Sequence, residues 1–263
     1  MAKSKGIALK KRHGQNFLRD ERFVHCMFDA VTLTKQSSIL EIGCGDGFLT
    51  RAILRNPIAR LRVYEIDEEW VRYIKETVKD KRLTLLLQNF LDVDLEVLAE
   101  HAPWTVLANL PYHVTFPILH SFQKYRRYLK EGVIMVQEEV AQKITKTSGR
   151  GYGYVSLFFQ YYFEWKQLEK VPPAAFHPAP KVFSRLLYFN PIQNPKPIPH
   201  EAEFWDFIKS CFKQPRRTMR NNLKGSKYEA HGFSEEILSL RAQQMRMDQL
   251  LDLWNAIITQ WND

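Results

Sequence analysis

Four consecutive residues, Asn109-Leu110-Pro111-Tyr112, combine groups that suit the binding of a planar aromatic amine. The exocyclic amine of adenine is a poor nucleophile because its lone pair is delocalised into the ring, so a site that methylates it offers acceptors to the two amine hydrogens. The side-chain oxygen of Asn109 is one acceptor. Pro111 restricts Leu110 to an extended conformation, which fixes the direction of the Leu110 carbonyl as the second. Tyr112 can stack on the base. The alternative is an ordinary Asn-x-Pro turn.

A glycine-rich turn, EIGCGDGFLT at residues 41–50, is the second candidate site. Its glycines, Gly43 and Gly45 among them, allow a backbone to approach a ligand closely. The third glycine of a dinucleotide fingerprint is replaced by Phe48, which weakens an interpretation as an NAD-dependent oxidoreductase. Glu65 follows in the phrase YEID, where a carboxylate can accept both hydroxyls of a ribose. The pattern predicts an adenosine-bearing cofactor without a pyrophosphate; a tight turn without a ligand is the alternative.

Strands that alternate with helices must position these residues. Short apolar runs predict buried strands, and the segments between them have helical spacing. Alternation of this kind indicates a parallel sheet covered on both faces, with ligands at the carboxyl ends of the strands. The strands are expected at residues 38–43, 61–65, 83–87, 105–108 and 132–136, and the helices at 48–54, 67–79, 116–125 and 138–144.

The second half of the chain differs in composition. The aromatic runs at 155–165 and 182–189 alternate like strands and predict an antiparallel edge of the sheet. Residues 190–200 contain four prolines and can be neither helix nor central strand. The sequence therefore predicts a first domain at 1–190 and a small all-helical domain at 191–263. The helices of the second domain are expected at residues 203–212, 235–240 and 248–258.

Positive charge is concentrated in two segments. The chain has 38 Lys and Arg against 29 Asp and Glu, a formal net charge of +9. Residues 1–22 have seven basic and two acidic side chains, and residues 181–227 have ten and three. Such an excess indicates a polyanionic partner, although charged runs also serve solubility. The candidate phosphate contacts are Lys10, Lys11, Arg12, Arg216, Arg217, Arg220, Lys224 and Lys227.

Several other classes of protein are disfavoured. The longest uncharged stretch, residues 102–123, contains three prolines and does not suit a lipid-facing helix. The basic N-terminus has no apolar region of a secretory signal, so a cytoplasmic protein is expected. Cys26, Cys44 and Cys211 are widely spaced, and neither C-x-x-C nor H-E-x-x-H occurs. The sequence therefore supports neither a disulfide framework nor a metal site.

Five motifs occur in an order and spacing that resemble the ribosomal RNA adenine dimethyltransferases. They cover nearly the whole chain, and the NLPY motif is most similar to that of the small-subunit dimethyladenosine transferases of this family. The motifs are GQNFL at 14–18, EIGCGDGFLT at 41–50, NLPY at 109–112, FHPAPKV at 176–182 and CFKQPRRTMRNNL at 211–223.

The resemblance implies a Rossmann-like methyltransferase fold that binds S-adenosylmethionine and carries a small C-terminal helical domain. It places the cofactor against Asn16 and Leu18, the glycine turn at Gly43 and Gly45, and Glu65 at the ribose. Asn109 would lie near the reacting methyl group.

Two positions depart from the pattern of the family. Asn89 stands where the family usually has Asp beside the cofactor adenine. Its oxygen can accept a hydrogen bond from the adenine amine but has no charge, and Asp92 is the alternative contact. Cys44 stands where proline is common; a buried small side chain fits there better than a reactive thiolate.

The resemblance also implies a reaction and a partner. An extruded adenine would lie between Tyr112 and Phe176. The prolines around Phe176 predict that this residue lies in an exposed loop. Direct methyl transfer would modify two adjacent adenosines in a hairpin loop near the 3′ end of small-subunit ribosomal RNA, within an assembling subunit. No metal or membrane is expected, and the protein is expected to be a monomer. Alternatives are a large-subunit RNA methyltransferase and an assembly factor whose catalysis is dispensable.

Overall fold

The chain forms two compact units. A computed structural model describes residues 3–8, 10, 15–229 and 233–261. One unit comprises Met1–Ala141 and Phe163–Gln193, and the other comprises Gln142–Tyr162 and Asn194–Asp263. The predicted division at residue 190 differs from this packing, because residues 142–162 belong with the C-terminal unit. Lys11, Arg12 and Gly14 lie outside the described residues.

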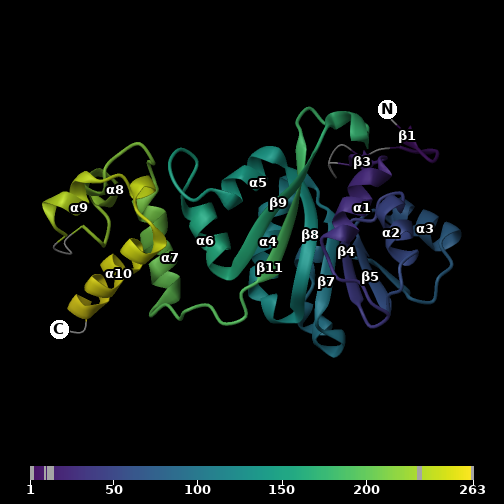
Figure 1. Cartoon of the computed structure of the whole chain (residues 1–263), viewed down its shortest axis with the longest axis horizontal. Helices are drawn as coiled ribbons and strands as arrows, with labels where there is room; N and C mark the ends of the chain where they lie inside the picture. The colour runs from purple at the N-terminus through teal and green to yellow at the C-terminus, as the bar shows by residue number, and fades with distance from the viewer. Residues whose placement is uncertain (1–2, 9, 11–14, 230–232, 262–263) are drawn as a thin grey trace. The chain divides into compact units, whose positions relative to one another are not determined.

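A seven-stranded sheet in the order β6-β5-β4-β7-β8-β11-β9 forms the first unit (Figure 1). The first five strands in this order are parallel, and β11 and β9 are antiparallel to their neighbours. The chain leaves β4 toward β5 and β6 and returns on the other side at β7, so a topological switch point lies between β4 and β7. The strands are β4 Ser38–Ile42, β5 Arg60–Glu65, β6 Leu83–Leu87, β7 Trp104–Asn109, β8 Leu129–Gln137, β9 Phe163–Val171 and β11 Ser184–Pro191.

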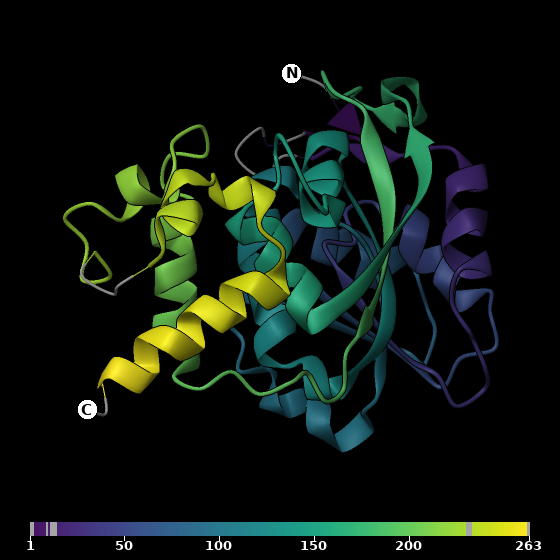
Figure 2. The ribbon, with the colours of Figure 1, turned by 60° about the vertical axis from the view of Figure 1, so that its left-hand side comes forward.

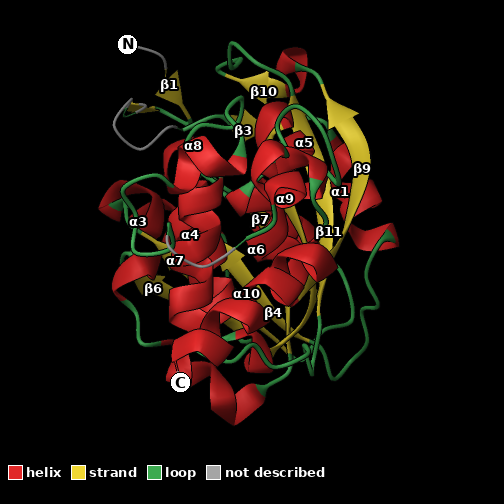
Figure 3. Cartoon of the chain, turned by 90° about the vertical axis from the view of Figure 1, so that its left-hand side faces the viewer, coloured by secondary structure: helices red, strands yellow, loops and turns green. Residues whose placement is uncertain are grey.

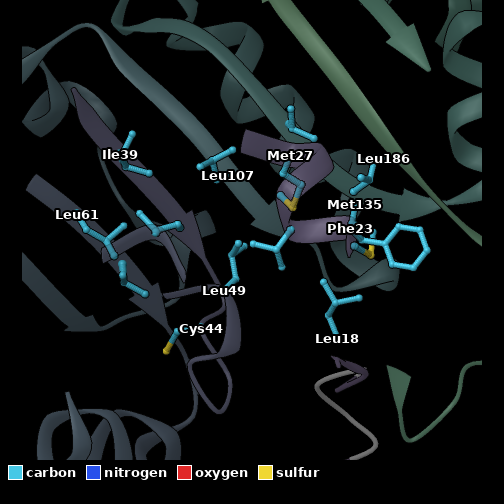
Figure 4. Close-up of a cluster of buried hydrophobic side chains, with 14 of the residues drawn as sticks. Leu18, Phe23, Met27, Ile39, Cys44, Leu49, Leu61, Leu107, Met135 and Leu186 are labelled. Atoms are coloured by element: carbon cyan, nitrogen blue, oxygen red, sulfur yellow. The ribbon is translucent and has the colours of Figure 1, made fainter. Parts of the chain in front are cut away.

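Helices lie on both faces of this sheet, as the alternating sequence pattern predicts. On one face α1, α2 and α3 pack on the strands (Figure 1), and the core there is apolar, with Met27, Ile39, Leu61 and Leu107 fully buried (Figure 4). On the other face, Phe122 of α4 stacks on Phe189 of β11. The helices are α1 Glu21–Asp29, α2 Phe48–Leu54, α3 Glu68–Thr77, α4 Thr115–Lys124 and α5 Glu138–Thr145.

Two short strand pairs involve the N-terminal segment. β3 (Phe17–Leu18) pairs antiparallel with β10 (Phe176–His177) (Figure 3), and β1 (Lys3–Ser4) pairs with β2 (Ile7–Ala8). The backbone amide of Arg19 also donates to the carbonyl of Ala175 at 2.8 Å. The N-terminal segment is therefore held against a part of the chain that is distant in sequence.

The second unit is helical. α10 packs across α7 (Figure 2), and Trp254 stacks on Phe207 while its ring nitrogen donates to the carbonyl of Pro199. The predicted C-terminal helices are all present. The helices are α6 Tyr154–Tyr162, α7 Glu201–Cys211, α8 Met219–Leu223, α9 Glu235–Ser239 and α10 Met247–Trp261.

The prediction of a strand at residues 155–165 is wrong for most of its length. Residues 154–162 form α6, and β9 begins only at Phe163. Two polar residues one turn apart explain the helix, because Ser156 donates to the carbonyl of Lys143 and Gln160 donates to that of Ile144. These bonds satisfy carbonyls at the end of α5. The flanking aromatic residues are buried within the same unit, so apolar periodicity could not distinguish helix from strand.

Gly132 in β8 has no room for a side chain. A Cβ at this position would lie 2.6 Å from the Phe189 ring and 2.8 Å from the carbonyl oxygen of Val106. We expect Gly132→Ala to lower the free energy of unfolding by about 1–3 kcal/mol, since overpacking forces the strands apart. Urea denaturation measures this loss. Gly153→Ala is the control, because its Cβ would meet Phe212 at an ordinary 3.4 Å. Equal stability of the two variants would contradict the prediction.

Three further observations concern the described part of the chain. None of its helices combines the length and apolarity that crossing a membrane requires. No group of three or more His, Cys, Asp or Glu side chains there is arranged to hold a metal ion. Cys26, Cys44 and Cys211 are free thiols.

Candidate active site

A cavity of about 200 Å³ opens at the carboxyl ends of the strands that flank the switch point. The sequence predicts an active site at this edge, and most of the candidate residues line the cavity. The predicted residues among its walls are Asn16, Gly43, Gly45, Glu65, Asn89, Asn109, Leu110, Pro111 and Tyr112.

The glycine turn has two different reasons for its glycines. Gly43 has a φ of +74°, and a Cβ there would meet nothing within 4 Å, so the backbone borders open space. Gly45 has a φ of +48°, and its Cβ would lie 2.4 Å from the Phe17 ring. The positive φ favours glycine at both positions, and at Gly45 the N-terminal segment also excludes a side chain. Phe17 lines the cavity and meets Trp70 edge to face.

Glu65 stands at the end of β5 with its carboxylate held by the backbone. The amide of Gly45 donates to Oε2 at 3.0 Å, and the amide of Asp67 donates to Oε1 at 2.9 Å. Burial raises the pKa of Glu65, and these two hydrogen bonds oppose the increase. Cys44 Sγ also donates to Oε2, at 3.7 Å. A carboxylate fixed in this way fits the paired hydroxyls of a ribose.

Asn109 ends β7 and is oriented by the N-terminal segment. Its Nδ2 donates to the main-chain carbonyl of Asn16 at 2.9 Å. Because the amide nitrogen is used in this bond, Oδ1 is the atom of Asn109 left to accept a hydrogen bond from a ligand. The backbone amide of Leu110 donates to the carbonyl of Met135 at 3.1 Å, which fixes the next residue of the motif against β8. The two expected acceptors therefore come from a rigidly held turn.

Tyr112 is half-buried, and its hydroxyl forms a hydrogen bond with Ser184 Oγ. Burial raises the pKa of the Tyr112 phenol, and the bond to Ser184 opposes this. The phenol is therefore neutral at physiological pH. The ring is available as a wall of the cavity, and the side chain is not a general base.

Asn89 and Asp92 form a pair beside the cavity. Asn89 lines it, and its Oδ1 accepts from the amide of Leu91 while its Nδ2 donates to Asp92 Oδ2 at 3.0 Å. Asp92 does not line the cavity. Of the two alternatives for the adenine contact, the geometry favours Asn89, with Asp92 holding the orientation of its amide.

Leu18 and Phe176 are not part of the cavity wall. They are register partners in the β3–β10 pair and are only 4% and 5% exposed. The prediction that Phe176 lies in an exposed loop is wrong, because the prolines on either side bracket a short strand that turns the ring into the core. Sequence reasoning also missed Phe17, although it lies inside the motif at 14–18, and Ile66, which follows Glu65 and is 51% exposed at the cavity.

Glu41, which precedes the glycine turn, is a buried carboxyl that the sequence did not single out. Thr50 donates to its Oε2 at 2.8 Å, whereas Oε1 has no hydrogen-bond partner among the described residues. Burial raises the pKa of Glu41 to about 8. Cys44, its neighbour in the turn, has its pKa raised well above the usual value, also by burial, so a thiolate is disfavoured.

The raised pKa of Glu41 predicts a pH dependence of stability. The folded state prefers the protonated carboxyl, so its contribution is fully present below the ordinary pKa of 4.5 and is lost as the pH rises to about 8. Glu41→Gln cannot ionise, so its stability relative to the wild type should increase by roughly 2–4 kcal/mol between pH 5 and 8. Urea denaturation at several pH values measures the difference. A constant difference across this range would show that Glu41 ionises normally.

The basic residues differ in their availability for phosphate. The sequence predicts Lys10 as a phosphate contact. In the structure its ammonium group is paired with Asp67 at 2.6 Å and with Glu69 at 2.7 Å, so it anchors the N-terminal segment instead. In the second unit, Arg220 pairs with Glu235 and Lys227 with Asp206. Three others are exposed and make no ion pair with any described residue: Arg216, Arg217 and Lys224.

A buried asparagine holds the loop that carries two of these arginines. Asn222 is 5% exposed, and its Nδ2 donates to the carbonyls of Gln214 and Arg217 while its Oδ1 accepts from the amide of Gln214. The loop therefore has a fixed backbone and presents Arg216 and Arg217 to solvent. This contact gives a structural reason for the asparagine in the motif at 211–223.

Comparisons with known proteins agree with this geometry. The sequence profile of the family described as ribosomal RNA adenine dimethylase matches residues 6–259. The chain is 34% identical over 246 residues to the ribosomal RNA small subunit methyltransferase A of Syntrophotalea carbinolica, covering 93% of this chain and 92% of that protein. It is 36% identical over 252 residues to the protein of the same name from Chlorobium luteolum, covering 95% and 90%.

Two solved structures share the fold. A dimethyladenosine transferase from Plasmodium falciparum superposes with a TM-score of 0.78 at 17% identity, covering 92% of this chain and 98% of that one. The 23S rRNA methyltransferase ErmE superposes with a TM-score of 0.71 at 20% identity, covering 92% and 100%. The fold is therefore that of the Rossmann-like methyltransferases, as the sequence predicts.

Proposed function

Because the chain belongs to the ribosomal RNA adenine dimethylase family, we propose that it dimethylates the exocyclic amine of two adjacent adenosines in small-subunit ribosomal RNA. The target is a hairpin loop near the 3′ end of that RNA, within the assembling subunit. The observation that carries this proposal is the cavity in which Asn109, Leu110 and Tyr112 meet Gly43 and Glu65. Membership of this family argues against the oxidoreductase interpretation left open by the glycine turn.

The cavity fits S-adenosylmethionine, which supplies an electrophilic methyl group on a sulfonium. Glu65 accepts hydrogen bonds from the two ribose hydroxyls, and the open side of Gly43 leaves room for the chain of the cofactor. The oxygen of Asn89 accepts from the adenine amine, with its amide oriented by Asp92. Ile66 offers an exposed apolar surface to the adenine ring. Asn16 and Phe17 close the cavity from the N-terminal segment.

The target adenine is held by the turn after β7. Asn109 Oδ1 and the Leu110 carbonyl accept the two amine hydrogens, which leaves the nitrogen lone pair directed toward the methyl group. The ring of Tyr112 stacks on the base. S-adenosylmethionine would supply the methyl group to this nitrogen and leave as S-adenosylhomocysteine, and the proton lost by the amine would pass to solvent water. The second transfer begins from an amine with one hydrogen, so only one of the two acceptors is then used.

The proposal of small-subunit rather than large-subunit RNA as the substrate rests on the similarity to named relatives and not on the fold. The two relatives compared above, at 34% and 36% identity, are small-subunit methyltransferases by name. The large-subunit enzyme ErmE shares only 20% identity, so its similarity indicates fold alone. Arg216, Arg217 and Lys224 would position the RNA through its phosphates without reading the bases.

Transfer of labelled methyl groups from S-adenosylmethionine to unmethylated small subunits, at low and high salt, tests this proposal. We expect dimethyladenosine at two adjacent positions, identified by mass, with less incorporation at high salt. Unmethylated large subunits are the control substrate. Incorporation only into large subunits would favour the rival substrate. If Asn109→Ala abolished methylation but subunits still matured normally in a strain without the wild-type gene, the assembly-factor alternative would be correct.

A further inference from the structure

A second groove, of about 710 Å³, lies in the first unit beside the cofactor cavity and shares none of its lining residues. Its walls come from the N-terminal segment, the glycine turn, α1, α2, α3 and His177 of β10. The glycine turn separates the two sites, because Gly45 lines the cavity and Asp46 lines the groove. A ligand in the groove would therefore be distinct from the cofactor.

Arg51 of α2 is a fixed cation in this groove. Its Nη1 donates to the carbonyl of Asp46 at 2.6 Å, its Nη2 donates to Thr77 Oγ1 at 2.8 Å, and its guanidinium lies 5.6 Å from the centre of the Tyr73 ring. All of these partners are neutral. No carboxylate of the described residues lies within ion-pair distance of Arg51. Because a guanidinium has five donors, Arg51 keeps hydrogens and an uncompensated charge for an anion.

The other charged walls leave an excess of positive charge. Arg19 is paired with the buried Asp46 at 2.6 Å, and Arg55 is paired with Glu21 at 3.3 Å on an exposed surface. Lys5 is exposed and, like Arg51, has no ion pair among the described residues. The groove therefore has four Lys and Arg side chains but only two carboxylates, those of Glu21 and Asp46. Exposed pairs contribute little to stability, so Arg55 is free to exchange Glu21 for a stronger anion.

We propose that this groove binds a phosphodiester group of the substrate RNA, held by Arg51 with Lys5 and Arg55. The inference rests on the proposed function, which makes the partner an RNA. A planar guanidinium whose position is already fixed suits phosphate oxygens, since little conformational freedom is lost on binding. RNA is the expected source of the phosphate because the proposed substrate is an RNA and because two cations of the groove, Lys5 and Arg19, belong to the basic segment at residues 1–22.

The test compares substitutions of exposed cations inside and outside the groove. Arg55→Gln removes a groove cation whose side chain is 69% exposed, and Arg72→Gln is the matched control. Arg72 is 66% exposed and pairs with Glu68 at 3.2 Å, but it does not line the groove. Lys5→Gln, combined with Arg55→Gln, removes a second cation. Binding to unmethylated small subunits is measured without cofactor over a range of salt concentrations.

We expect the slope of log affinity against log salt to fall by about 1 for Arg55→Gln and by about 2 for the double variant, with no change for Arg72→Gln. S-adenosylmethionine affinity should be the same in all of these proteins. Equal slopes in the wild type, the double variant and the control would overturn the groove proposal even if methylation proceeds. Reduced slopes without methylation of small subunits by the wild type would support the groove and contradict the proposed function.

Discussion

Replacement of Asn109 by alanine is expected to lower kcat for RNA methylation by about 10²–10³-fold, the loss typical when one preorganised polar group is removed from a reacting centre. The structure explains why the loss should be large. Nδ2 of Asn109 is bound to the Asn16 carbonyl, so Oδ1 is oriented before substrate arrives. Its removal deprives the target amine of an acceptor that costs no reorganisation at the moment of reaction.

Single-turnover methylation of small subunits measures this effect. Asn255→Ala, an exposed substitution on α10, is the control for loss of an asparagine. Asn109→Asp provides a second comparison, because it keeps an acceptor oxygen but places a carboxylate against the Asn16 carbonyl. We expect this variant to be impaired as well, with a lower melting temperature. An Asn109→Ala enzyme that retains more than a third of wild-type kcat would show that Asn109 does not hold the target amine.

Replacement of Glu65 by alanine is expected to weaken S-adenosylmethionine binding by about 10²–10⁴-fold. Each hydrogen bond between a ribose hydroxyl and a charged group contributes roughly 1.5–3 kcal/mol, and Glu65 offers two oxygens. The substitution also leaves the amides of Gly45 and Asp67 without their acceptor. Glu65→Gln keeps one acceptor oxygen, so its affinity for S-adenosylmethionine should lie between those of the wild type and Glu65→Ala.

Isothermal calorimetry with S-adenosylmethionine and with S-adenosylhomocysteine measures the change. Glu68→Gln is the control, because its side chain is 69% exposed on the neighbouring helix α3 and does not line the cavity. Thermal unfolding without ligand distinguishes a lost contact from a collapsed turn. Binding by Glu65→Ala within threefold of the wild type would place the ribose elsewhere.

The sequence predicts correctly those elements whose pattern of apolar and polar residues fits only one type of secondary structure. Strands such as β7 and β8 contain apolar runs, and α3 begins at Glu68, directly after Asp67, whose side chain caps it. The aromatic run that forms α6 is apolar at nearly every position, so its periodicity has no preferred value. Its helix is stabilised by Ser156 and Gln160 through bonds to α5, and these partners cannot be read from the local sequence.

The same distinction applies to the site. Glu65 and Asn109 end parallel strands, and topology alone brings such positions together. Phe176 could not be placed in this way, because its burial depends on pairing with Leu18 from the other end of the unit. The role of Gly45 was also hidden, since the Phe17 ring that excludes a side chain there lies in a different motif.

The pairing of β3 with β10 has a consequence for the order of events during synthesis. Asn16 and Phe17 form one wall of the cavity, and the segment that holds them in place is completed only when His177 has been made. Contacts of such large sequence separation form late, because the entropy of closing the loop must be overcome first. A nascent chain that has left the ribosome only as far as β8 therefore contains the glycine turn, Glu65 and Asn109 but lacks a finished cofactor site. The wall formed by Asn16 and Phe17 can therefore be fixed only after the chain has been made as far as His177.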